Sequence, residues 1–360
     1  MKEKSAAQAA FLSRYGDDDQ RQHSPIISTA SIMLVYFMYI TSSMIPPLLV
    51  LFLAAIALGL IERYILAILA TMIAVDFAIP LPNGYKPNAA KKASGERLYA
   101  EGMQHYFPAR SIFLPKNLDK EKAYILAAWP HGLMGGGGHV GFADFSQRGF
   151  NVIYTGASIM KYVPFVRRLL HSWGFTDVSK GSLGKVLNVK KYGPTYPNNV
   201  AHLVVGGIHE MFYTPYNSNK EQIILDKRKG FIKLALTNQC DIIPMYTFGA
   251  NQQYQRIFGH KSVLCKLSTS LQMSLVVWLG RWKIPMSWIP IPVPLLGVVG
   301  EVFEVPKVDS EKITDELVQQ VHSDFCVTLK KLFDDYKKVY VDEMGADPEW
   351  LTRELKLETE

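Results

Sequence analysis

A long apolar stretch near the N-terminus, residues 26–81, most constrains how this 360-residue chain can fold. Crossing the hydrocarbon core of a bilayer takes about 20 apolar residues. Residues 26–45 meet this requirement before Pro46 and Pro47 end the helix, and the run 48–79 is long enough to return. We therefore expect a transmembrane helical hairpin over residues 26–81. The alternative is a pair of helices buried in a soluble domain.

The flanks of this stretch predict which side of the membrane holds the remaining chain. Residues 1–25 are polar and are expected to form a cytosolic N-terminal arm. Basic residues favour the cytosolic side of a membrane span. Four of them follow the second apolar run: Lys86, Lys91, Lys92 and Arg97. We therefore expect both ends of the chain in the cytosol.

Beyond residue 95 the pattern changes to short apolar strands that alternate with amphipathic helices. The expected strands are 124–128, 152–155, 200–205 and 241–248, and the expected helices are 163–173, 229–237 and 313–340. Such alternation predicts an α/β fold with a mixed, partly parallel sheet flanked by helices. We place this domain at residues 95–345, followed by a C-terminal tail at 346–360.

Within this domain, residues 271–299 combine aromatic and basic residues and then several prolines. The aromatic and basic residues are Trp278, Trp282, Trp288, Arg281 and Lys283. This combination suits the headgroup layer of a membrane. A proline-rich loop folded over the core explains the composition equally well, so both interpretations stay open.

The formal net charge of +7 suits an anionic lipid surface or a phosphorylated ligand. The sequence has no zinc-finger spacing and no RNA-binding aromatic box, so we expect no nucleic-acid partner. Its three cysteines lie far apart without a CxxC spacing. His131 and His139 have no third ligand at a convincing spacing, so we expect no metal site.

The most informative segment for chemistry begins at Trp129 and continues through His131 into a run of glycines. The histidine follows the end of an expected strand, which is where α/β sheets bind ligands. An imidazole there can accept a hydroxyl proton near neutral pH, and backbone N–H groups of Gly132, Gly135 and Gly136 can stabilise an oxyanion. A structural histidine is the alternative. The segment is no P-loop, and the chain has no GxSxG elbow.

A second expected strand ends in a glycine turn that is followed by a carboxylate. Gly206 and Gly207 form the strand-turn, and Glu210 comes three residues after it. Glu210 can share a cleft with His131, where a carboxylate would orient the imidazole and stabilise its charged form. A surface glutamate is the alternative.

A basic cluster leads into the expected helix 229–237. Arg228, Lys229 and Gly230 follow Lys227, and such consecutive cations suit the phosphates of coenzyme A. A solvated charged face is the alternative.

In their order along the chain, these segments resemble the type-2 diacylglycerol acyltransferase family, which includes monoacylglycerol and wax-ester acyltransferases. The resemblance covers residues 95–340. Further matching segments are 234–236, 244–249, 298–301, 305–307 and 332–334.

The resemblance implies an enzyme without a cofactor that transfers a fatty acyl group from acyl-CoA to the hydroxyl of a neutral lipid, with His131 as the catalytic base. Diacylglycerol is the expected acceptor, and monoacylglycerol or a long-chain alcohol is the alternative. The family also implies an anchor in the endoplasmic reticulum membrane, contact with membrane lipids and a cytosolic catalytic domain. Residence on lipid droplets and assembly into a homo-oligomer stay open.

The sequence departs from the family pattern at Trp129, where the family has a histidine, and at Ala250, where a glutamate is usual. A second proton-handling group is therefore missing, so a catalytically silent lipid-binding protein and a lipid hydrolase are alternatives. Gly136 stands where related glycerol-phosphate acyltransferases have an aspartate. Glu210 is therefore the expected partner of His131.

Overall fold

The computed structural model describes only part of the chain, and most of the N-terminal 88 residues lie outside that part. The described residues are 26–27, 29–30, 33, 55–56, 58–59, 63–79, 89–133, 140–164, 166–172, 174–188, 199–214, 216, 218–271 and 274–358. The expected arm at 1–25 and the first expected span at 26–45 are therefore almost entirely outside the described residues.

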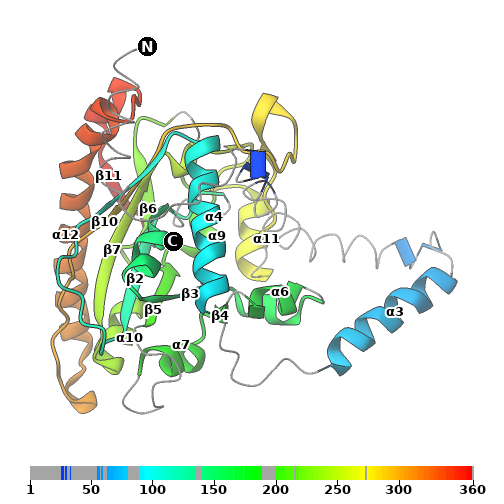
Figure 1. The fold of residues 1–360 in the computed structure, drawn as a ribbon, viewed down its shortest axis with the longest axis horizontal. Coiled ribbons are helices and arrows are strands. Elements are labelled where there is room, and N and C mark those ends of the chain that lie inside the picture. Colours follow the sequence, from blue (N-terminus) through cyan, green and yellow to red (C-terminus); the bar gives the residue numbers. More distant parts are fainter. Residues whose placement is uncertain are drawn as a thin grey trace.

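A seven-stranded sheet in the order β1-β10-β7-β2-β5-β3-β4 forms the centre of the domain (Figure 1). Its strands are β1 (Ala109–Phe113), β2 (Tyr124–Trp129), β3 (Asn151–Gly156), β4 (Thr176–Asp177), β5 (Asn199–Val204), β7 (Asp241–Phe248) and β10 (Leu295–Val299). All neighbouring strands are parallel except β10 and β7. The expected mixed, partly parallel sheet is confirmed, and the four expected strands are β2, β3, β5 and β7.

The composition of β2 explains its central place in the sheet. All six of its residues are buried, as a parallel strand requires when helices cover both of its faces. Ala128 pairs with Val204 of β5 on one side and with Met245 of β7 on the other. These three parallel strands therefore end at the same edge of the sheet.

Helices cover both faces of the sheet, and α12 and α4 lie on opposite sides of it in Figure 1. On one face, α7 (Lys180–Leu187), α10 (Gly230–Asn238) and α12 (Asp315–Asp342) form a core with alternate residues of β2. On the other, α5 (Phe142–Gln147) packs on the sheet, and α4 (Ala89–Tyr106) lies against α5. The three expected helices are present as α6 (Val166–Ser172), α10 and α12.

Local sequence explains where α12 begins and which face it buries. The hydroxyl of Thr314 accepts a hydrogen bond from the N–H of Leu317 at 3.2 Å and so caps the helix. Asp315 and Glu316 lie in the first turn, where a negative charge is favourable. The buried side chains recur three or four residues apart, as one helix face requires: Val318, Val321, His322, Phe325, Leu329, Leu332 and Phe333.

The segment 271–299 ends in β10 of the central sheet, and several of its residues before β10 pack in a hydrophobic cluster with α4 and α11 (Val263–Leu271). It includes β9 (Trp278–Leu279), which pairs with β8 (Gln255–Arg256), and the turn η4 (Arg281–Lys283), and α11 precedes it. Trp278 is buried in a hydrophobic cluster with residues of α4 and α11, whereas Trp282 is 67% exposed and Trp288 is 37% exposed. The segment is thus partly folded over the core and partly on the surface.

The second half of the expected hairpin contains the apolar helix α3 (Arg63–Ala78), whose exposed side chains include Ile68, Met72 and Val75. Its C-terminal end is held to α6 by Asp76, which lies 2.7 Å from Nε of Arg167 and 2.5 Å from Nε of Arg168. Within the described part of the chain, no helix has the length and apolar character to cross a bilayer.

The segment expected as a C-terminal tail, 346–360, is part of the folded domain as far as Glu358. It forms a short 3-10 helix, η6 (Pro348–Thr352), and the strand β11 (Leu355–Glu358). This strand pairs in parallel with β6 (Glu221–Ile224) in a separate two-stranded sheet.

Replacing Phe333 by alanine tests the assigned core face of α12. Phe333 is fully buried, and its ring stacks on Phe248 of β7 with 5.3 Å between the centroids. Phe333→Ala should lower the free energy of unfolding by about 3–5 kcal/mol. Val327→Ala, at a position on the same helix that is 67% exposed, should change it by less than about 0.5 kcal/mol. Chemical unfolding in detergent measures both, and equal losses would contradict the assignment.

Candidate active site

The carboxyl ends of β2, β5 and β7 bring three loops together at one edge of the sheet. His131 follows β2, the short helix α9 (Gly207–Glu210) follows β5, and Ala250 follows β7. A Cβ atom added to Gly132 would lie 3.1 Å from the carbonyl oxygen of Ala250, so the first and third loops are in contact. Gly132 has φ +60, a conformation that glycine adopts without strain.

Glu210 joins these loops through backbone hydrogen bonds. Its Oε1 accepts from the N–H of His131 at 2.5 Å, and its Oε2 accepts from the N–H of Ile224 on β6 at 2.8 Å. The carboxyl group is buried, with the residue 3% exposed. The structure therefore brings the two predicted residues together, but the carboxylate holds the main chain of His131 and not its imidazole.

The glycine turn before α9 permits this contact. A Cβ atom at Gly206 would collide with the carboxyl group of Glu210, which folds back against the turn. Gly207 follows with φ +62. The predicted strand-turn thus has a direct physical reason, because only a residue without a side chain leaves room for the carboxylate.

The imidazole of His131 is oriented by its own loop. Its Nδ1 lies 3.0 Å from the carbonyl oxygen of Gly132. Because a carbonyl oxygen only accepts hydrogen bonds, Nδ1 carries the proton and the basic lone pair is on Nε2. Burial lowers the pKa of His131, although the Gly132 carbonyl opposes this effect. We expected Glu210 to orient the ring; the Gly132 carbonyl holds that position instead.

Burial has the opposite effect on Glu210 and raises the pKa of its carboxyl to about 7. The N–H groups of His131 and Ile224 and the charge of Arg228 favour the ionised form and limit this rise, whereas the charge of Glu221 adds to it. The carboxyl therefore changes its protonation state near neutral pH.

The predicted basic cluster borders this site. Arg228 is half-buried, and its positive charge acts on Glu210 strongly enough to affect the pKa of both groups. Lys229 stands at the N-terminal cap of α10, which begins at Gly230. The N-terminal end of a helix attracts anions. Arg228 and the start of α10 are thus placed to attract a negative group near Glu210.

Trp129 packs in the core, where it is completely buried. Its ring centroid lies 5.9 Å from that of Phe231 on α10 and 5.7 Å from that of Phe325 on α12. Its Nε1 has no hydrogen-bond partner in the described part of the chain. The side chain at this position therefore fills space between the sheet and two helices.

Two parts of the site were missed by sequence analysis, and two predicted residues lie outside the described residues. Ile224 contributes only its backbone N–H, which no sequence pattern reveals. Glu221 is 1% exposed, and it begins a strand whose last two residues are the apolar Ile223 and Ile224. Gly135 and Gly136 fall in the undescribed stretch 134–139. Among the described residues, no group of three or more His, Cys, Asp or Glu could hold a metal ion.

The raised pKa of Glu210 predicts a specific dependence of stability on pH. A carboxyl whose pKa rises from an ordinary 4.5 to about 7 on folding stabilises the fold below 4.5, and this contribution is lost as the pH rises through 7. Relative to Glu210→Gln, which cannot titrate, the wild type should lose about 3 kcal/mol of unfolding free energy between pH 4.5 and pH 8. A pH-independent difference between the two proteins would show that this carboxyl is not buried as described.

Substitution of Trp129 tests whether this position serves packing. Trp129→His should lower the free energy of unfolding by about 2–4 kcal/mol, because it opens a cavity and buries a polar ring. Trp129→Phe keeps an aromatic ring and removes the unpartnered N–H, so it should cost about half as much or less. Thermal unfolding of both variants provides the comparison, and a histidine variant as stable as wild type would refute the packing role.

Comparisons with known proteins identify the family of the chain. A sequence model of the family described as diacylglycerol acyltransferase matches residues 57–346. Diacylglycerol O-acyltransferase 2 of Dictyostelium discoideum is 33% identical over 251 residues, which cover 66% of this chain and 72% of that protein. Acyl-CoA wax alcohol acyltransferase 2 of Mus musculus is 29% identical over 286 residues, which cover 75% of this chain and 81% of that protein. No solved structure matches the chain. The chain is therefore an acyltransferase that belongs to the type-2 diacylglycerol acyltransferase family.

Proposed function

We propose that the chain transfers a fatty acyl group from acyl-CoA to the hydroxyl of diacylglycerol, with His131 as the general base. The observation that carries this proposal is the hydrogen bond between Nδ1 of His131 and the Gly132 carbonyl. It leaves Nε2 of a neutral imidazole as the basic atom, at the edge of the sheet where α/β folds bind ligands.

The reaction is a direct transfer without an acyl-enzyme intermediate, and His131 carries one proton from the acceptor hydroxyl to the leaving thiolate. Nε2 of His131 takes the proton of the acceptor hydroxyl while the hydroxyl oxygen forms a bond to the thioester carbonyl carbon. The tetrahedral intermediate collapses, the carbon–sulfur bond breaks, and the imidazolium returns the proton to the coenzyme A thiolate. The products are the new ester and free coenzyme A.

Glu210 has an indirect role in this proposal. Its ionised carboxylate holds the N–H groups of His131 and Ile224, so it fixes the position of the His131 loop. Backbone N–H groups of Gly132, Gly135 and Gly136 are proposed to stabilise the oxyanion of the intermediate.

We assign the basic cluster to acyl-CoA. Arg228 and Lys229 supply positive charge beside Glu210 and at the start of α10, where Gly230 leaves the backbone open to an approaching phosphate. This position would direct the phosphates of coenzyme A away from the hydrophobic core and the thioester toward His131.

The proposal has two kinds of alternative: a different acyl acceptor, and a protein that binds lipid without catalysis. The mouse relative is named for wax alcohols, so a long-chain alcohol is the second candidate acceptor, and monoacylglycerol is the third. A catalytically silent lipid-binding protein was suggested by Trp129. That argument weakens because the indole packs against Phe231 and Phe325 in the core.

We further propose that the protein is anchored in the endoplasmic reticulum membrane, with its catalytic domain in the cytosol and access to lipid droplets. Support comes from the apolar residues 26–81 and from the exposed aromatic and basic surface of the 281–288 segment. Such a surface suits the headgroup layer, where membrane lipids would meet the site.

Replacing the proposed base tests the mechanism. His131→Ala should reduce kcat by about 10²- to 10⁴-fold, as expected for loss of a general base. His105→Ala, which changes an exposed histidine of α4, should leave kcat unchanged. Full-length protein in detergent or vesicles is assayed with radiolabelled acyl-CoA, and near wild-type turnover in His131→Ala would end the proposal.

The acceptor is identified in the same assay by competition. Diacylglycerol, monoacylglycerol and a long-chain alcohol are supplied at equal concentration, and the labelled esters are separated by chromatography. Triacylglycerol should dominate. A dominant wax ester would replace the acceptor in the proposal, and labelled free fatty acid without any ester would indicate a hydrolase.

A further inference from the structure

The C-terminal segment 348–358 lies directly against the strand that supports Glu210. Strand β11 pairs with β6 in the register Leu355 to Glu221 through Glu358 to Ile224. The N–H of Glu221 also donates to the carbonyl of Glu354 at 3.2 Å. Strand β11 is therefore paired along the whole length of β6.

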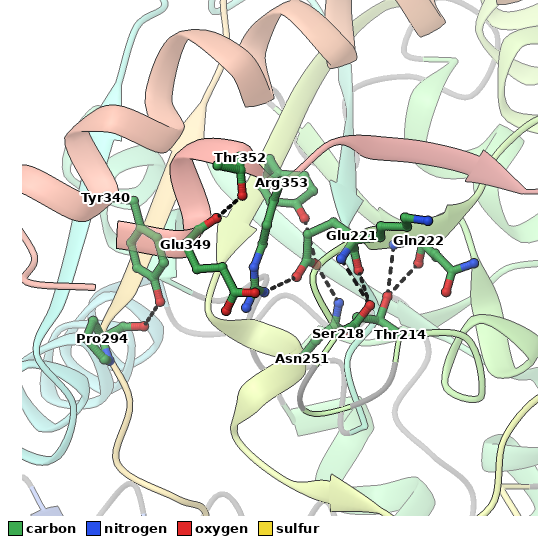
Figure 2. A network of polar contacts seen from close by, with 12 residues as sticks. Thr214, Ser218, Glu221, Gln222, Asn251, Pro294, Tyr340, Glu349, Thr352 and Arg353 are labelled. Atoms are coloured by element: carbon green, nitrogen blue, oxygen red, sulfur yellow. Dashed lines mark hydrogen bonds and ion pairs between the residues drawn. The ribbon is translucent and has the colours of Figure 1, made fainter. Parts of the chain in front are cut away.

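A buried ion pair between Arg353 and Glu221 also joins the C-terminal segment to β6 (Figure 2). Nη1 of Arg353 lies 3.1 Å from Oε1 of Glu221, and the residues are 5% and 1% exposed. Oε2 of Glu221 accepts hydrogen bonds from the hydroxyl of Tyr246 at 3.0 Å and from Nδ2 of Asn251 at 2.9 Å. The guanidinium also lies over the ring of Trp350, 4.1 Å from its centroid.

The contacts of Glu221 lead to His131 by two routes, through β6 and Glu210 and through the loop that follows β7. Ile224, three residues after Glu221 on β6, donates its N–H to Glu210, and Glu210 in turn binds the N–H of His131. Asn251 follows Ala250, whose carbonyl oxygen faces Gly132. Glu221 therefore connects the two supports of the His131 loop, and Arg353 neutralises its charge.

We propose that Arg353 is a positioning residue for catalysis, which acts through Glu221 to hold β6 and the Asn251 loop where they fix His131. The C-terminal segment is then part of the catalytic scaffold, although it lies beyond the family match at residues 57–346. The pair is buried, so loss of Arg353 leaves an uncompensated charge that draws water or shifts β6. This inference rests on the proposed role of His131.

Arg353→Met tests the inference without removing Trp350 from the core. A small displacement of a catalytic group costs about 10- to 100-fold in rate, so kcat per folded molecule should fall by that factor while KM for acyl-CoA stays within about twofold. Arg353→Lys keeps the charge and should retain more of kcat than the methionine variant.

A matched control and a double variant complete the test. Arg110 pairs with Glu343 at the end of α12, where both side chains are partly exposed, so Arg110→Met should leave kcat unchanged. Glu221→Gln combined with Arg353→Met leaves no buried charge and should regain part of the lost kcat. If Arg353→Met does not accumulate as folded protein, kcat of the lysine variant and of the double variant is compared with that of the wild type instead.

The outcomes separate this inference from the proposed function. Lower thermal stability with an unchanged kcat would reduce Arg353 to a structural role and overturn the inference, as would a raised KM with unchanged kcat. If His131→Ala is inactive in the same assay and Arg353→Met turns over like wild type, only the positioning role fails. If His131→Ala remains active, the proposed mechanism itself fails.

Discussion

The carboxylate of Glu210 is the contact on which the geometry of the site depends. It accepts hydrogen bonds from the N–H of His131 at 2.5 Å and from the N–H of Ile224 at 2.8 Å. These two groups belong to loops and strands that are far apart in the sequence, and the carboxylate is the shared acceptor between them. Gly206 leaves the space that the carboxyl group occupies. This buried acceptor therefore links the backbone of His131 to that of β6.

Burial shifts the pKa values of His131 and Glu210 in opposite directions, and both shifts fit the proposed base catalysis. It lowers the pKa of His131 and so keeps the imidazole neutral, with Nδ1 donating to the Gly132 carbonyl. The same burial raises the pKa of Glu210 to about 7, and the nearby charge of Arg228 opposes the rise. An ionised Glu210 beside His131 therefore costs the folded protein stability at neutral pH. Such a conflict between stability and function is common at active sites.

The sequence predicted which strands lead to the site and which glycine turns follow them. The buried composition of β2 and β7 and the glycine turns after β2 and β5 placed His131 and Glu210 at one sheet edge, because parallel strands end together. The contact between Glu210 and a backbone N–H could not be predicted, since every residue except proline has that group. Strands β6 and β11 have four residues each. They pair across more than a hundred residues, so only the folded chain reveals that the expected tail supports the site.

The account is tested most directly by hydrogen exchange at the backbone N–H of His131 and Ile224. Both donate to a buried carboxylate, so above pH 7 they should exchange in the wild type as slowly as the amides of β2. In Glu210→Gln, where an amide cannot accept both bonds, exchange at these two positions should become much faster while β2 is unchanged. Rapid exchange of these amides in the wild type, or equal rates in the two proteins, would contradict the central role of Glu210.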